Sequence, residues 1–149
     1  MKFQNILTSF HTSQKIFEAG YEHETLFLWK HPPEGMGSPD LVKMGCLGTQ
    51  YEGLRYYPAY TVQELGIAIF KGSIKKVYFG HSSDRIDGPM FIGQVWDGTK
   101  LHTFHAYSEV ILRSDVLLFL ISMGWVSRNR EATHSEPTQQ RGRKLRINE

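Results

Sequence analysis

The chain has 149 residues, of which 40% are hydrophobic and 21% charged, with a formal net charge of +2. This composition is typical of a soluble globular domain that buries a core without disulfides or metal. A single cysteine, Cys46, excludes an intramolecular disulfide, and no apolar run reaches the roughly 20 residues of a membrane-spanning helix. The start of the chain also lacks the apolar core of a signal peptide, so a cytoplasmic setting is expected.

The first half of the chain predicts one helix and one strand. Thr8 and Ser9 precede a helical pattern that begins at Phe10 and is closed by Gly20. The segment 25–30, TLFLWK, has strand composition and ends at two prolines. A loop is expected over 34–40, and the glycines within 41–57 predict short bent strands or irregular structure.

A second helix begins at Thr61. Thr61 and Glu64 have the spacing of a capping box, and Tyr60 is placed to pack against Leu65 as a hydrophobic staple. Gly66 costs this helix roughly 1 kcal/mol relative to alanine. We therefore expect that Gly66 permits close packing.

The strongest pattern lies in the C-terminal half. A strand is predicted over 75–83, and a β-hairpin over 90–107 has Asp97-Gly98 as its turn. A helix over 108–123 follows, with Ser108 as its N-cap and Gly124 as its C-terminal cap. Its predicted buried stripe is Leu112, Val116, Phe119 and Met123, and Arg113 is predicted to point outward.

These elements predict an α+β fold: a mainly antiparallel sheet centred on the C-terminal hairpin and packed by two to three helices. The periodic pattern closes at Val126, so one globular domain is expected over 1–126 and a polar tail over 127–149. The tail holds six basic residues and three glutamates, a net charge of +3, which leaves −1 for the rest of the chain. The basic character therefore belongs to the tail and not to the domain.

Several short motifs carry a family resemblance. They are Thr8-Ser9 before a helix with Gln14-Lys15 and Gly20, Tyr57-Pro58-Ala59-Tyr60-Thr61 opening a helix with Leu65, and Ser114-Asp115 with Leu118, Leu120, Ile121 and Gly124-Trp125-Val126. In this order the motifs resemble a group of small uncharacterised proteins of Bacteroides-type bacteria, their phages and their mobile elements. His11, Thr12 and the basic tail depart from the group. The resemblance implies an origin and a fold and assigns no activity.

Two histidine-hydroxyl motifs are the candidates for catalysis. His11-Thr12-Ser13 and His81-Ser82-Ser83 resemble the paired motif of two-histidine phosphoesterases, in which both histidines converge on one phosphate. The residues that flank them are polar where that motif has apolar strand residues, which favours a non-enzyme. His102 and His105 are three residues apart on a predicted strand and point to opposite faces, so no metal site is expected, and no cofactor motif is present.

The tail is the candidate for electrostatic binding. It has almost no apolar content before Leu145, so it cannot repay its ordering entropy alone. A basic segment of this kind can become ordered on RNA, DNA or an acidic protein. The contacts would be made by Arg141, Arg143, Lys144 and Arg146.

The leading hypothesis is a non-catalytic accessory protein of a phage or mobile element that binds a protein partner in the cytoplasm of a bacterial host. The chain is 13% aromatic, and surplus aromatic side chains often line interfaces. Two alternatives remain: a phage anti-defence protein that sequesters or cleaves a signalling nucleotide, and a nucleic-acid-binding factor that uses the tail. No membrane partner is expected, and no oligomeric state is predicted.

Overall fold

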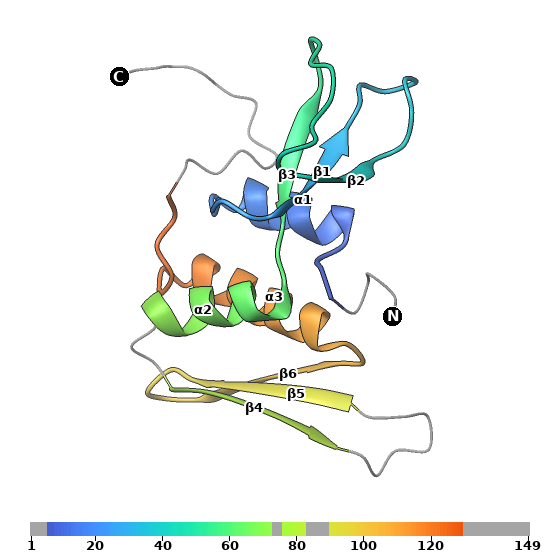
Figure 1. Ribbon diagram of the computed structural model, residues 1–149. Helices are drawn as coiled ribbons and strands as arrows, with labels where there is room; N and C mark the ends of the chain where they lie inside the picture. Colours follow the sequence, from blue (N-terminus) through green and yellow to red (C-terminus); the bar gives the residue numbers. More distant parts are fainter. Residues whose placement is uncertain (1–5, 73–75, 83–89, 130–149) are drawn as a thin grey trace, which may run out of the picture.

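The computed structural model describes residues 6–72, 76–82 and 90–129 (Figure 1). Within these ranges the chain has an α+β fold, as the sequence predicted. The elements in chain order are α1 (Phe10–Glu18), β1 (Phe27–His31), β2 (Asp40–Lys43), β3 (Arg55–Ala59), α2 (Val62–Gly72), β4 (Lys76–Ser82), β5 (Met90–Trp96), β6 (Leu101–Ala106) and α3 (Glu109–Ser122).

The described strands form two antiparallel sheets, with strand orders β2-β1-β3 and β4-β5-β6. Helices α2 and α3 form a layer between them, with α1 and the β2-β1-β3 sheet on one side and the β4-β5-β6 sheet on the other (Figure 1). One sheet was predicted because segment 41–57 reads as irregular. In the structure the glycines of this segment lie in the loop between β2 and β3. These two short strands pair with β1 and so form a second sheet.

Helix α3 is buried on two sides, because it packs against α2 as well as against β5 and β6. Leu117 and Leu120 are wholly buried. Of the predicted stripe, Val116 is wholly buried and Leu112 is 1% exposed. The predicted stripe is wrong at its end, since Met123 is 45% exposed. A helix that packs between two layers buries side chains on more than one of its faces, and the spacing of apolar residues does not show which faces these are.

Arg113 does not point outward as predicted. Its guanidinium donates to the Val62 carbonyl at 3.2 Å and to Glu109 Oε2 at 3.0 Å, and it lies 5.1 Å from the centre of the Phe79 ring. It thus joins α3 to α2 and to β4. Gly66 of α2 leaves the space for it, because a Cβ at position 66 would lie 2.2 Å from Arg113 Nη1. The predicted close packing at Gly66 is confirmed.

The predicted helix starts are confirmed in position. Thr61 and Glu64 form both hydrogen bonds of a capping box: the Thr61 N–H donates to Glu64 Oε1 at 2.9 Å, and the Glu64 N–H to Thr61 Oγ1 at 3.1 Å. Ser108 is the N-cap residue of α3, but its hydroxyl makes no capping hydrogen bond. The start of α3 is therefore set by packing more than by its cap.

The β5–β6 turn lies one residue later than predicted. The Asp97 N–H donates to the Lys100 carbonyl at 3.2 Å, so Gly98 and Thr99 are its central residues. The Asp97 carboxylate accepts from the N–H groups of Thr99 and Lys100, each at 2.7 Å, and lies 2.8 Å from His102 Nε2. The bond to His102, followed by those to the turn, lowers the pKa of Asp97.

Many aromatic side chains serve packing and not an outer surface. Phe10 contacts Trp29 and Tyr57, and Phe119 contacts Phe104 and Trp125. Other large apolar side chains lie exposed on the face of the β4-β5-β6 sheet opposite to α3, which we call the outer sheet face: Tyr78, Trp96 and Leu101. None of the helices described is long and apolar enough to cross a bilayer.

Candidate functional site

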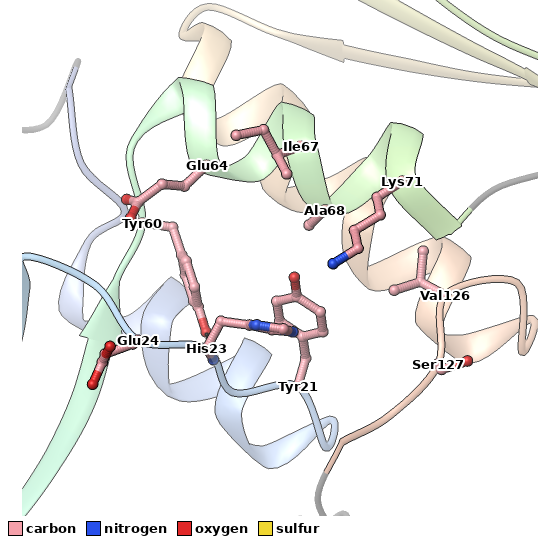
Figure 2. Close-up of a pocket in the computed structure, with 10 residues that line it drawn as sticks. All are labelled: Tyr21, His23, Glu24, Tyr60, Glu64, Ile67, Ala68, Lys71, Val126 and Ser127. Carbon is pink, nitrogen blue, oxygen red and sulfur yellow. Dashed lines mark hydrogen bonds between the residues drawn. The ribbon is translucent and has the colours of Figure 1, made fainter.

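A hollow of about 410 Å³ lies along α2, between the α1–β1 loop and the segment after α3 (Figure 2). We call it the α2 groove. Beside α2, the segments that follow α1 and α3 come together. It is lined by Tyr21, His23, Glu24, Tyr60, Glu64, Ile67, Ala68, Lys71, Val126 and Ser127.

The end of α1 places Tyr21 in the groove. Gly20 has a φ of +98°, and it donates its N–H to the Phe17 carbonyl at 3.0 Å, while the Tyr21 N–H donates to the Ile16 carbonyl at 3.2 Å. These two bonds define a Schellman motif, in which the residue after the glycine turns back onto the helix. Tyr21 is consequently only 8% exposed although it follows a helix end.

The end of α3 repeats this motif and places Val126 opposite. Gly124, with a φ of +77°, donates to the Ile121 carbonyl at 3.0 Å, and the Trp125 N–H donates to the Leu120 carbonyl at 2.9 Å. The chain therefore folds back and buries Val126. The sequence predicted this turn from Gly124-Trp125-Val126, and the prediction is confirmed.

Asn129 joins these two helix ends. Its N–H donates to the Gly20 carbonyl at 3.0 Å, its Oδ1 accepts from the Glu22 N–H at 2.7 Å, and its Nδ2 donates to the Glu22 carbonyl. These three hydrogen bonds, of which the two to Glu22 span 107 positions of sequence, hold the segment after α3 against the α1–β1 loop as far as Asn129.

Tyr60 forms the remaining wall. Its N–H donates to Thr8 Oγ1 at 3.0 Å and its carbonyl accepts from the Thr8 N–H at 2.9 Å. Thr8 Oγ1 in turn lies 2.6 Å from Ser13 Oγ, and both hydroxyls are buried. The Tyr60 hydroxyl accepts from the His23 N–H at 3.1 Å. Tyr60 is therefore held both at its backbone and at its hydroxyl.

Burial keeps the groove's phenols neutral. Desolvation is the largest cause that raises the pKa of Tyr60 above its ordinary value of 10.0, and the charges of Glu22 and Glu64 raise it further. The pKa of Tyr21 is raised by burial and then by Glu64. Both side chains therefore act near neutral pH as walls and hydrogen-bonding groups.

This burial predicts a loss of stability in alkali. The unfolded chain releases the Tyr60 proton above about pH 10, whereas the folded chain retains it, so the free energy of unfolding should fall as the pH rises further. In Tyr60→Phe the fall should be shallower. Urea unfolding between about pH 8 and 11 measures both slopes, with Tyr51→Phe in an exposed loop as the matched control. If the free energy of unfolding falls equally steeply with pH in the parent and in Tyr60→Phe, the raised pKa of Tyr60 is contradicted.

The groove has oppositely charged ends. Glu64 lies in the first turn of α2, and Lys71 lies in its last turn. Figure 2 shows the Lys71 ammonium directed into the groove toward the Tyr21 hydroxyl. The His23 ring packs on the Tyr21 ring, with 4.7 Å between their centres. Between the two ends lie the exposed Ile67 and the buried Ala68, so the site combines an apolar stretch with a few polar groups, as binding pockets do.

The structure does not bring the predicted catalytic histidines together. His11 is exposed on α1 and His81 is exposed on β4, and the layer of α2 and α3 lies between those elements (Figure 1). His102 faces Phe119 of α3, with 4.7 Å between the ring centres, whereas His105 is exposed. Neither His11 nor His81 lines the α2 groove.

The other sequence-predicted sites lie elsewhere. Arg141, Arg143, Lys144 and Arg146 are outside the described residues. Cys46 is exposed in the loop after β2. In the ranges 6–72, 76–82 and 90–129, no three histidine, cysteine or carboxylate side chains are grouped so that they could hold a metal ion.

Sequence reasoning missed the α2 groove because its residues come from three distant segments. One signal was available: Gly20 and Gly124 each follow a helix and precede large side chains, a pattern that predicts two chain reversals. It does not predict that the two reversals meet. No family model, curated protein or solved structure matches the chain.

Proposed function

We propose that this protein acts by binding a partner protein, and that an extended segment of the partner lies in the α2 groove. One observation carries the proposal: a hollow of about 410 Å³, whose walls are held by hydrogen bonds, has the exposed Ile67 on its rim. Ile67 is 58% exposed beside the buried Tyr21 and Tyr60. Aromatic and aliphatic side chains around a preformed recess are typical of the centre of a protein interface.

The rigidity of the groove supports binding because a preformed site loses little conformational entropy when it is filled. Asn129 joins the α1–β1 loop to the segment after α3, and Thr8 holds Tyr60 in place by a hydrogen bond to its N–H. The neutral phenols add hydrogen-bonding groups without buried charge. These features suit a peptide that hydrogen-bonds to the phenols through its main chain and places its apolar side chains in the α2 groove.

The setting we propose follows from the sequence resemblance. The protein is an accessory protein of a phage or mobile element, and it acts in the cytoplasm of the bacterial host. The two alternatives depend on other features. Sequestration of a signalling nucleotide requires a pocket lined by histidines and arginines, whereas the described residues that line the α2 groove include one histidine and no arginine. Nucleotide cleavage requires His11 and His81 to converge, and nucleic-acid binding requires the basic tail, so the α2 groove favours protein binding.

The test is a selection from a random heptapeptide library displayed on phage, with the purified full chain as bait. Peptides enriched by the parent should bind Ile67→Glu roughly tenfold to a hundredfold more weakly, because a buried isoleucine contributes about 1.5 to 3 kcal/mol. Fluorescence anisotropy with the synthesised peptide measures the change. Ile111→Glu is the matched control, since Ile111 is also an exposed isoleucine on a helix, at 48% exposure, and does not line the groove.

Two results would contradict the proposal. One is that no peptide is enriched by the folded parent. The other is that Ile67→Glu and Ile111→Glu weaken binding equally, which would place the peptide outside the α2 groove.

A further inference from the structure

We infer that the segment bound in the α2 groove carries an acidic side chain at the Lys71 end and a basic side chain about four residues away at the Glu64 end. This inference rests on the proposed function and names the chemistry of the partner. It is carried by the charges at the two ends of the groove and by their spacing on α2.

The Lys71 end offers three hydrogen-bonding groups to an anion. The Lys71 ammonium points into the groove toward the Tyr21 hydroxyl, with the His23 ring beside them (Figure 2). Within the described part of the chain, no ion pair joins Lys71 to a carboxylate. Hydrogen bonds from an ammonium to a carboxylate are about twice as strong as neutral ones. A single cation suits a carboxylate better than a phosphate dianion.

The Glu64 end offers a negative charge. Glu64 Oε1 accepts the Thr61 N–H of the capping box, and Glu24 lies on the same side of the hollow in Figure 2. The second oxygen of Glu64 makes no hydrogen bond to any other described residue. The charges of Glu22 and Glu64 also contribute to the raised pKa of Tyr60 beside them. A lysine or arginine side chain of the partner is therefore favoured here.

The spacing fixes how the segment runs. Glu64 and Lys71 are two helical turns apart, which is about 10.5 Å along the axis. An extended chain rises about 3.3 Å per residue and its side chains alternate between two faces. Residues four apart therefore face the same side and span about 13 Å, a distance that long charged side chains can match to the spacing of Glu64 and Lys71. The side chain midway between the two charged positions then lies over Ile67 and Ala68, where an apolar residue fits.

The acid is a side chain of a segment that passes through the groove and not a chain end. Terminal carboxylates are typically held by a cluster of backbone N–H groups. At the Lys71 end the groups available to an anion belong to side chains: the ammonium, the phenol and the imidazole.

The experiment repeats the display selection with Lys71→Glu as bait, using peptides that are internal to the displayed protein and have no free carboxyl end. The parent should enrich an acidic residue about four positions from a basic one. Lys71→Glu should enrich a basic residue in place of the acidic one and bind the parent's peptide about tenfold to a hundredfold more weakly. Lys76→Glu makes the same charge change on exposed β4, outside the groove, and should keep the parent's pattern.

Glu64→Gln tests the other end while its amide oxygen retains the capping bond. It should remove the preference for a basic residue and leave the melting temperature close to that of the parent. If Lys71→Glu enriches the same sequences as the parent, this inference is wrong, while the proposed function stands as long as Ile67→Glu still weakens binding. If no enriched peptide depends on Ile67, the proposed function itself is wrong.

Discussion

Replacing Leu117 by alanine is expected to lower the free energy of unfolding by about 2 to 5 kcal/mol, which is the usual cost of truncating a buried leucine. Leu117 is wholly buried and belongs to the core cluster that joins α3 to α2. The cavity left by the substitution would be closed in by well-packed neighbours, so it could collapse only in part. Urea unfolding followed by circular dichroism measures the change.

Met123→Ala is the matched control on the same helix. Met123 is 45% exposed at the C-terminal end of α3, so its truncation should change the free energy of unfolding by no more than about 0.5 kcal/mol. The comparison tests the orientation of α3, because the sequence pattern placed Met123 in the buried stripe. Equal losses from the two substitutions would show that the helix faces are assigned wrongly.

Gly66→Ala is expected to destabilise the parent by about 1 to 3 kcal/mol, although alanine has the higher helix propensity. The new Cβ would lie 2.2 Å from Arg113 Nη1, so the guanidinium must move. Movement weakens its hydrogen bonds to the Val62 carbonyl and to Glu109, together with its contact with the Phe79 ring. Chemical denaturation of the single variant gives the cost.

The sign of this effect should reverse when Arg113 is absent. In an Arg113→Ala background, Gly66→Ala should stabilise the protein by up to about 1 kcal/mol, because only the propensity difference remains. The double-mutant cycle reports the coupling between the two positions. Additive effects of the two substitutions would contradict the packing of Arg113 against Gly66.

Much of the fold was predictable because helix ends and hairpins are determined by neighbouring residues. Thr61 and Glu64 form the capping box that their spacing predicts, and Gly124 ends α3 as expected. The β5–β6 hairpin forms at its predicted place in the chain. In each case the interacting groups are a few residues apart, so the sequence contains both partners of the interaction.

The remaining features depend on partners that are distant in sequence. The orientation of α3 is set by layers on both of its sides, and Arg113 packs into the space that a glycine of α2 leaves. The α2 groove requires Gly20 and Asn129 to meet, and no local pattern encodes their contact. For the same reason, matching local sequences at His11 and His81 do not place the two side chains together.

The most direct test of the proposed binding site is an NMR titration of the isotopically labelled full chain with the peptide that the parent enriches. The largest shifts of amide signals are expected in 21–24, 64–71 and 126–127, the segments that line the α2 groove. Shifts confined to β4, β5 and β6 around Tyr78, Trp96 and Leu101 would place the partner on the outer sheet face and contradict the site proposed for the α2 groove.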